Sequence, residues 1–309
     1  MTRVAAIDLG TNSTRLLVAD VEGSGECSAL TVIDRRMHIT RLGQGVDATR
    51  RLHPDAIARN LAVLGEFREV ICDLGVERTR IAATSAARDA ANRADLFDPV
   101  TALLGAAPEL LSGEQEAALS FLGATSGLHE PAPFLVVDVG GGSTELAVGT
   151  LEPEWSVSLD LGCVRVTEAY LHSDPPGPEE LSAAVAAVRT QLAGASRQMS
   201  ASAPTPALTL VGLAGTVSTM AAIELGLESY SSEAIHHFRL TRSAAEDIFR
   251  TLACETADAR RHNPGLEAGR VDVIVGGVVV VVGVLRHFGF DEMLVSESDI
   301  LDGLARTAV

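Results

Sequence analysis

Short apolar runs separated by small polar residues open the chain. The runs at residues 4–9 and 16–21 flank Gly10-Thr11-Asn12-Ser13, which predicts a strand, a tight turn and a second strand. From His53-Pro54-Asp55 to about residue 74 the apolar positions take a helical spacing, and residues 79–84 return to a strand pattern. Strands and helices continue to alternate along the chain, which predicts an α/β protein with mixed sheets.

The strand–turn–strand pattern occurs twice. Residues 8–14 (DLGTNST) and 138–144 (DVGGGST) align at an offset of 130 residues. Small residues let backbone N–H groups approach an anion, and the Asp that ends each first strand can approach a metal ion. A single copy is also compatible with an ordinary hairpin whose polar side chains satisfy local backbone groups. Two copies in register predict a duplicated fold that binds its ligand between the two halves.

The most apolar stretch, residues 273–285, leaves its secondary structure open. Its run of five valines favours a strand, whereas Gly276, Gly277 and Gly283 suit a buried helix packed closely on a neighbour. With 13 residues between Asp272 and Arg286, the stretch is too short to span a bilayer.

Length and composition predict a globular protein of two domains. The chain has 309 residues, 47% of them hydrophobic, and 28 glycines. We expect one domain at residues 1–122, with the C-terminal helix at 297–309 as a candidate to complete it, and a second at 123–296. No secretory signal precedes the first strand, and Cys27, Cys72, Cys163 and Cys254 form no C-x-x-C motif. Reduced thiols and a cytoplasmic location are therefore expected.

The charge of the chain argues against nucleic acid as a partner. The formal net charge is −17, and all 24 basic residues are Arg. Residues 1–93 hold 13 Arg and 12 Asp or Glu, so this part repels a polyanion least. The use of Arg without Lys is also explained by a GC-rich genome.

Three further segments carry candidate chemistry. In residues 112–117 (SGEQEA), either Glu114 or Glu116 is a candidate general base, or both simply complement the helix dipole. Arg88, just inside a helix start, is suited to a phosphate or to pairing with a nearby carboxylate such as Asp89 or Glu66. Residues 213–219 (LAGTVST) bind a phosphate or part of a nucleotide, or form a plain helix cap.

Together these segments resemble the exopolyphosphatase/guanosine pentaphosphatase (Ppx/GppA) family of the actin-like, sugar-kinase-like superfamily. The matching stretches are residues 6–13 (AIDLGTNS), 83–88 (ATSAAR), 111–117 (LSGEQEA), 137–146 (VDVGGGSTEL), 161–165 (LGCVR) and 215–216 (GT). The resemblance implies two actin-like, ribonuclease H-like α/β domains with mixed sheets and an interdomain cleft.

The resemblance also implies a role for individual residues. Glu116 aligns with the glutamate that activates water, and Arg88 aligns with an arginine that contacts the phosphoryl group. Asp138 and Glu145 align with residues that hold Mg²⁺, with Mn²⁺ as the alternative ion, and Asp8 is a weaker candidate for the same shell. The implied phosphate-binding residues are Thr11, Asn12, Ser13, Gly141, Gly142, Ser143 and Thr144.

The expected activity is hydrolysis of the terminal phosphate of inorganic polyphosphate. Hydrolysis of guanosine pentaphosphate (pppGpp), a weakly active sensor of (p)ppGpp or polyphosphate, and a sugar or acetate kinase are the alternatives. The resemblance is to a short form without the HD-type C-terminal domain, which implies a preference for short chains. It further implies a homodimer and no membrane partner.

Overall fold

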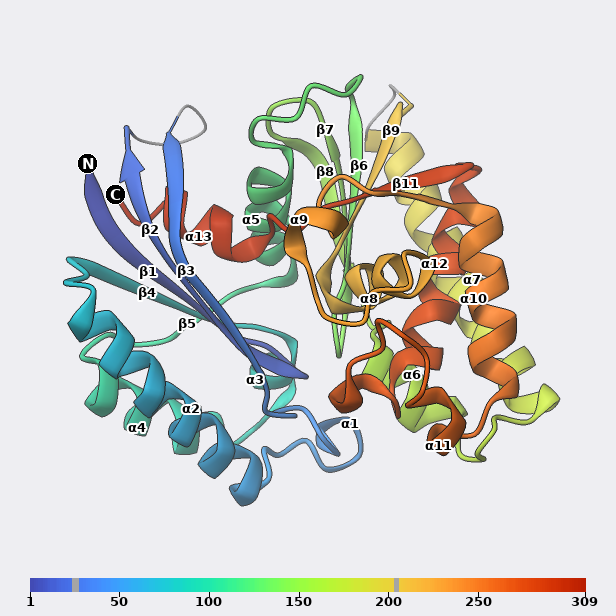
Figure 1. The fold of residues 1–309 in the computed structure, drawn as a ribbon, viewed down its shortest axis with the longest axis horizontal. Coiled ribbons are helices and arrows are strands. Elements are labelled where there is room, and N and C mark those ends of the chain that lie inside the picture. Colours follow the sequence, from blue (N-terminus) through green and yellow to red (C-terminus); the bar gives the residue numbers. More distant parts are fainter. Residues whose placement is uncertain (24–27, 203–205) are drawn as a thin grey trace. The chain divides into compact units, whose positions relative to one another are not determined.

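A computed structural model describes residues 1–23, 28–202 and 206–309, and the chain in it divides into two compact units. Unit 1 consists of residues 1–127 and 299–309, and unit 2 of residues 128–298 (Figure 1). The domain limits predicted from the sequence, 1–122 and 123–296, stay a prediction.

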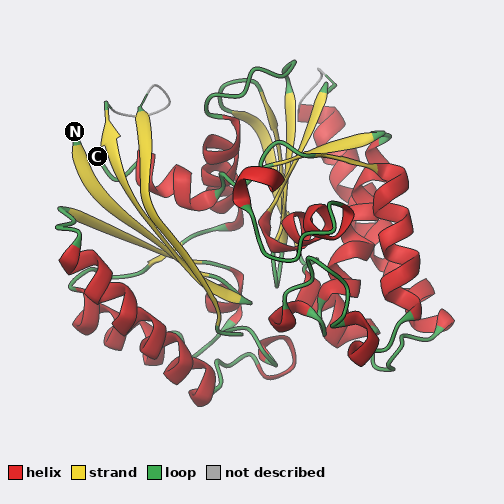
Figure 2. Ribbon diagram, in the orientation of Figure 1, coloured by secondary structure: helices red, strands yellow, loops and turns green. Residues whose placement is uncertain are grey.

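Unit 1 contains a five-stranded mixed sheet in the order β3-β2-β1-β4-β5 (Figure 2). β1 pairs antiparallel with β2 and parallel with β4. Its strands are β1 (Thr2–Leu9), β2 (Ser13–Glu22), β3 (Ala29–Ile39), β4 (Arg78–Ala83) and β5 (Glu109–Leu110). Its helices are α1 (Val46–Thr49), α2 (Pro54–Asp73), α3 (Ser85–Asp89), α4 (Ala94–Leu104), α5 (Gly113–Thr125) and α13 (Ile300–Arg306).

The central strand β1 is buried on both faces because its apolar residues alternate between two cores. Ala5, Ile7 and Leu9 face the core shared with α2 and α4. Val4 and Ala6 face the core shared with α13. Figure 1 shows α2 and α4 on one face of this sheet and α13 with α5 on the other.

Helices α5 and α13 meet at two glycines. A Cβ atom added at Gly123 would lie 1.8 Å from the carbonyl oxygen of Asp299, and one added at Gly303 would lie 2.1 Å from that of Leu119. No residue with a side chain fits at either position without moving a backbone. The helix α13 therefore packs against α5 with the two backbones in direct contact.

Unit 2 contains a six-stranded mixed sheet in the order β10-β11-β9-β6-β7-β8. The antiparallel set β6-β7-β8 and the parallel neighbours β9 and β11 repeat the arrangement of β1 to β5 in unit 1. The predicted fold class, a duplicated actin-like α/β fold with mixed sheets, is confirmed. The strands are β6 (Phe134–Val139), β7 (Thr144–Gly149), β8 (Pro153–Leu159), β9 (Thr209–Leu213), β10 (Arg239–Thr241) and β11 (Glu292–Val295).

The helices of unit 2 pack around one long apolar helix, α12. They are α6 (Cys163–Tyr170), α7 (Pro178–Ser202), α8 (Ala214–Glu224), α9 (Ser232–Ile235), α10 (Arg242–Cys254), α11 (Ala257–Arg260), the 3₁₀ helix η2 (Ala268–Arg270) and α12 (Ile274–Phe288). No helix in the described ranges is long and apolar enough to cross a membrane.

The valine-rich stretch that the sequence left open is the helix α12. Its glycines explain why β-branched residues do not force a strand here. A Cβ atom at Gly276 would lie 2.5 Å from Oγ1 of Thr167, and one at Gly283 would lie 2.6 Å from Cγ1 of Val188. The glycines let α6 and α7 approach, and the valines fill the remaining buried surface.

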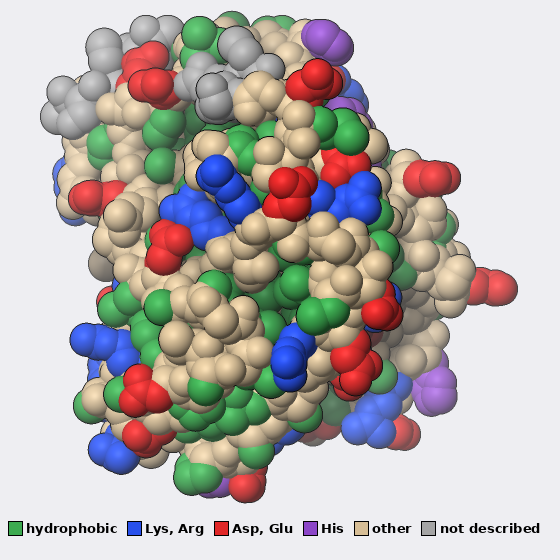
Figure 3. Space-filling model, turned by 90° about the vertical axis from the view of Figure 1, so that its left-hand side faces the viewer, with side chains coloured by type: hydrophobic (Ala, Val, Ile, Leu, Met, Phe, Trp, Pro, Cys, Tyr) green, Lys and Arg blue, Asp and Glu red, His purple; other side chains and the backbone are tan. Residues whose placement is uncertain are grey.

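The cysteines that the structure describes agree with the expectation of reduced thiols. Cys72, Cys163 and Cys254 are free thiols, and Cys27 lies outside the described residues. Burial raises the pKa of the Cys163 thiol. On the face shown in Figure 3, Arg side chains lie interspersed with Asp and Glu, so neither sign dominates it.

We predict that Gly303→Ala destabilises the protein by about 1–3 kcal/mol, because the added methyl group overpacks the α5–α13 contact. Gly65→Ala is the matched control, since Gly65 lies inside α2 with nothing within 4 Å of an added Cβ atom. It should stabilise the protein by about 0.5–1 kcal/mol. Urea titrations of both variants measure the change, and equal effects would contradict the packing argument.

Candidate active site

The turn between β6 and β7 is held by its carbonyl groups. The backbone N–H groups of residues 163–165 and Nε of Arg165 donate to the carbonyl oxygens of residues 140–142 over 2.7–3.2 Å. In a planar trans peptide the N–H points opposite to the C=O. The N–H groups of Gly141, Gly142 and Ser143 therefore point away from α6. A row of such N–H groups favours an anion.

Two further residues fix this turn in place. A Cβ atom at Gly162 would lie 2.3 Å from the carbonyl oxygen of Gly141, so only glycine lets the turn rest on the start of α6. The hydroxyl of Thr144 is fully buried and donates to the carbonyl of Leu161 at 2.6 Å. The Thr144 side chain thus ties the end of the turn to the segment before α6.

The turn between β1 and β2 in unit 1 has the same internal hydrogen bond. Gly10 N donates to Ser13 O at 3.0 Å, as Gly140 N does to Ser143 O at 3.0 Å. The carbonyls of Thr11 and Asn12 accept from the backbone of residues 40–43 at 2.8–3.0 Å. The side chain of Asn12 is 6% exposed, and its Nδ2 is buried with no hydrogen-bond partner. Such a donor fits an anionic ligand.

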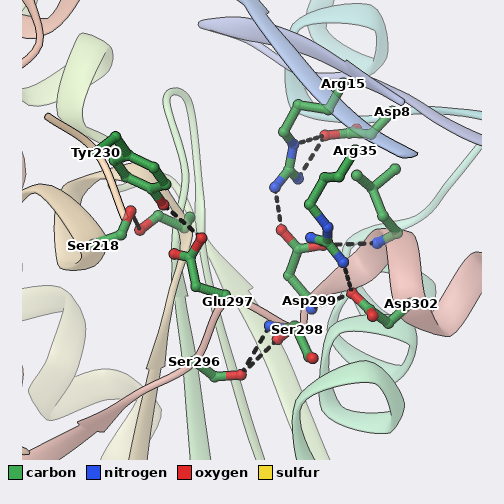
Figure 4. Close-up of polar contacts among 12 residues, drawn as sticks. Asp8, Arg15, Arg35, Ser218, Tyr230, Ser296, Glu297, Ser298, Asp299 and Asp302 are labelled. Atoms are coloured by element: carbon green, nitrogen blue, oxygen red, sulfur yellow. Dashed lines mark hydrogen bonds and ion pairs between the residues drawn. The ribbon is translucent and has the colours of Figure 1, made fainter. Parts of the chain in front are cut away.

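Asp8, at the end of β1, is balanced by an arginine. Its Oδ2 accepts from Nη2 and Nε of Arg15 at 2.7 and 3.1 Å, whereas its buried Oδ1 has no hydrogen-bond partner. Burial raises the pKa of the Asp8 carboxyl, and the Arg15 guanidinium opposes this rise. Arg15 also bonds to Asp299, the residue that caps α13 (Figure 4).

Unit 2 has two carboxylates where unit 1 has this ion pair. Asp138 and Glu145 are opposite each other on β6 and β7, as Asp8 and Arg15 are on β1 and β2. Both carboxylates are buried, with 6% and 2% exposure, and Glu145 accepts from Oγ of Ser158 at 2.7 Å.

Asp138 and Glu145 offer the oxygen ligands that a divalent cation prefers. Among the described residues, no group of three or more His, Cys, Asp or Glu side chains is placed to hold a metal ion. Mg²⁺, however, is commonly bound by one or two carboxylates together with water and substrate phosphates. Asp138 and Glu145 fit that mode. Asp8 offers only its Oδ1, because Arg15 occupies the other oxygen.

Arg88 and Glu116 form an ion pair within unit 1. Nη1 of Arg88 donates to Oε2 of Glu116 at 2.5 Å and to the carbonyl of Leu111 at 3.1 Å. Asp89, one of the partners considered for Arg88 from the sequence, contacts Arg50 at 3.5 Å.

The two glutamates near the start of α5 differ in burial. Ser112 and Gln115 form a capping box, which fixes the first residue of the helix at Gly113. Glu114 is then exposed, and Glu116 is buried with 8% exposure.

The start of α8 is covered by an arginine rather than by a side-chain cap. Its capping residue, Leu213, makes no side-chain hydrogen bond, and a Cβ atom at Gly215 would lie 2.1 Å from Nη1 of Arg270. The side chain of Arg270 is 11% exposed and contacts Glu267 at 3.1 Å. Positive charge therefore gathers at this helix start, as an anionic group would require.

Several residues of the unit 1 site were not singled out in the sequence. These are Arg15 and the residues linked to it through α13, namely Arg35, Asp299 and Asp302. A signal for Arg15 existed, since it occupies the repeat position of Glu145. Asp299 and Asp302 are nearly 300 residues away along the chain, and no local pattern connects them with Asp8.

Comparisons with known proteins agree with this geometry. A model of the Ppx/GppA phosphatase family matches residues 17–306. The protein named Exopolyphosphatase 2 from Mycobacterium tuberculosis is 45% identical over 99% of this chain and 98% of its own.

Solved structures agree as well. The crystal structure of an exopolyphosphatase-like protein matches with a TM-score of 0.91 and 36% identity, over 98% of this chain and 97% of that chain. The Ppx/GppA family member from Aquifex aeolicus matches with a TM-score of 0.82 and 31% identity, over 99% of this chain and 97% of its own. Together with the duplicated sheets, these matches show that the chain belongs to the Ppx/GppA phosphatase family.

Proposed function

We propose that this protein is an exopolyphosphatase, which releases orthophosphate from the end of inorganic polyphosphate. The observation that carries the proposal is the 45% identity, over nearly the full length of both chains, to a relative named exopolyphosphatase. The two turns whose N–H groups are directed outward support a polyanionic substrate. That both turns bind one substrate stays a prediction from the duplicated motif.

In this proposal the terminal phosphate is held by backbone N–H groups and by Arg88. Phosphoryl transfer depends on positioning and on charge stabilisation more than on covalent chemistry. The peptide groups of residues 140–143 are already fixed by their carbonyls, so they need no reordering when the phosphate arrives. Thr11, Asn12 and Ser13 are assigned the same task in unit 1.

Glu116 is the proposed general base. Its carboxylate accepts a proton from water as the water oxygen attacks the terminal phosphorus, and the bridging P–O bond breaks to free the shortened chain. The bond from Arg88 fixes the orientation of this carboxylate and balances its charge. Arg88 is thus placed to position both the base and the phosphoryl group.

We assign Asp138 and Glu145 to hold a divalent cation, Mg²⁺ in the first instance and Mn²⁺ as the alternative. Bound there, the cation would neutralise charge on the phosphate oxygens. Asp8 is the weaker member of this set, because Arg15 already balances its charge.

Guanosine pentaphosphate remains the alternative substrate, because it presents a terminal phosphoanhydride of the same kind. A sensor that binds (p)ppGpp or polyphosphate with little turnover is the alternative from a different class. Phosphate release from polyphosphate and from pppGpp, measured side by side with Mg²⁺, separates these three. Release from neither, with binding retained, would favour the sensor.

We predict that Glu116→Gln folds normally and lowers phosphate release by about 10²–10⁴-fold, because the amide cannot accept the proton from water. Glu114→Gln is the matched control, since it removes the same charge from the exposed side of the same helix turn. Near-normal turnover by Glu116→Gln would exclude Glu116 as the base.

We predict that Glu145→Gln raises the Mg²⁺ concentration needed for half-maximal activity by about tenfold or more, because one cation ligand loses its charge. Glu154→Gln, on the exposed side of the neighbouring strand β8, should leave it unchanged. Calorimetric titration with Mn²⁺ gives a readout independent of turnover. Unaltered cation affinity in Glu145→Gln would remove this residue from the metal site.

We predict faster phosphate release per chain end from polyphosphates of tens of residues than from those of hundreds. The physical reason is that the residues assigned above hold only the terminal phosphate, so a long substrate gains no binding from them, whereas a short chain diffuses to the site faster. Rates measured against chain length check this, and a clear preference for the long substrates would refute it.

A further inference from the structure

A serine on the last strand of the unit 2 sheet contacts one of the two carboxylates assigned to the cation. Oγ of Ser158 donates a hydrogen bond to Oε1 of Glu145 at 2.7 Å. Glu145 is 2% exposed, so its carboxylate is largely shielded from water. An ionised carboxylate only accepts hydrogen bonds, whereas a serine hydroxyl can donate one. The hydroxyl of Ser158 is thus matched to the charged form of Glu145.

Strand pairing explains how this contact arises. Glu145 on β7 is opposite Asp138 on β6 and also opposite Ser158 on β8. Residues directly opposite each other in an antiparallel sheet point to the same face, with Cβ atoms about 5 Å apart. Asp138, Glu145 and Ser158 therefore form one row across three neighbouring strands, with Glu145 in the middle.

The corresponding row of unit 1 has a different residue at its third position. There Asp8 is opposite Arg15, and Arg15 is opposite Met37 on β3. Arg15 is a donor whose guanidinium contacts Asp8 and Asp299, and the thioether of Met37 offers it no further donor or strong acceptor. Where the middle residue is the acceptor Glu145, the third strand supplies a hydroxyl.

We propose that Ser158 is a positioning residue for the divalent cation assigned to Asp138 and Glu145. The last torsion of a Glu side chain is only weakly restricted by itself. The hydrogen bond to Oε1 restricts it and holds the carboxylate of Glu145 in one orientation. Carboxylates that bind metal ions are commonly oriented by such a hydrogen bond from a second residue. The inference rests on the proposed function, which assigns the cation to this pair.

Ser156 provides a matched comparison within the same strand. It lies two residues before Ser158 on β8, so it points to the same face of the sheet, and both serines are partly buried. The residue opposite Ser156 is Ala147, whose side chain is a methyl group. The two serines thus share strand, face and side chain, and they differ in the residue across from them.

Calorimetric titration of the full chain with Mn²⁺ tests the proposal without turnover. Ser158→Ala should lower the affinity for Mn²⁺ by about tenfold or more, because the orientation of Glu145 is no longer fixed. Ser156→Ala should leave the affinity unchanged, and Ser158→Thr, which keeps the hydroxyl, should retain most of it. Thermal unfolding without added cation checks that each variant is folded.

Phosphate release against Mg²⁺ concentration gives a second readout. Ser158→Ala should need about tenfold more Mg²⁺ for its half-maximal rate. Its rate at saturating Mg²⁺ should approach that of the wild type, because the proposed base Glu116 is untouched. A purely structural role for Ser158 would not make the loss recoverable by added Mg²⁺.

Three results would overturn the proposal: a wild-type chain without affinity for Mn²⁺, unchanged affinity in Ser158→Ala, or equal losses in Ser156→Ala and Ser158→Ala. A Ser158→Thr variant as weak as Ser158→Ala would likewise place the effect in packing rather than in the hydroxyl. A wild type that binds Mn²⁺ and releases no phosphate would contradict the proposed function alone, since the comparison of affinities still decides the role of Ser158.

Discussion

The conformation of the turn between β6 and β7 depends on the hydrogen bonds that its carbonyl groups accept. The carbonyl groups of residues 140–142 are hydrogen-bonded to the start of α6. Because each peptide is planar, the N–H groups of Gly141, Gly142 and Ser143 point the opposite way, away from α6. Gly162 makes this contact possible, and Thr144 supports it from the strand behind. A turn of this type can attract an anion without a charged side chain, because its ordered backbone points several N–H groups in one direction.

The two halves use the duplicated motif in different ways. Each has an Asp at the end of its first strand, but the residue across from it is Arg15 in unit 1 and Glu145 in unit 2. In unit 1 the positive charge beside Asp8 is therefore the guanidinium of Arg15, which also contacts Asp299 at the start of α13. In unit 2 the same position holds a second acid, Glu145, in place of the arginine. One change of charge between the two copies thus turns an internally balanced ion pair into a pair of buried carboxylates.

Local patterns predicted much of this fold, because hairpins, turns and helix caps are formed by residues close together in the chain. The repeat at residues 8 and 138 gave the duplicated sheet, and the motifs gave the two turns. The helical state of the valine-rich stretch and the link from Arg15 to α13 could not be predicted from local patterns. Both depend on contacts between distant segments, that of Gly276 with Thr167 and that of Arg15 with Asp299.

Unit 1 is assembled from two pieces of chain that are far apart, and this affects the order in which the protein can fold. Its second core needs Ile300, Leu301 and Leu304, whereas the residues of unit 2 are contiguous. On the ribosome, a nascent chain usually folds its N-terminal domain first. Here the second core of unit 1 cannot be completed before α13 has been synthesised, which happens after all of unit 2 has emerged.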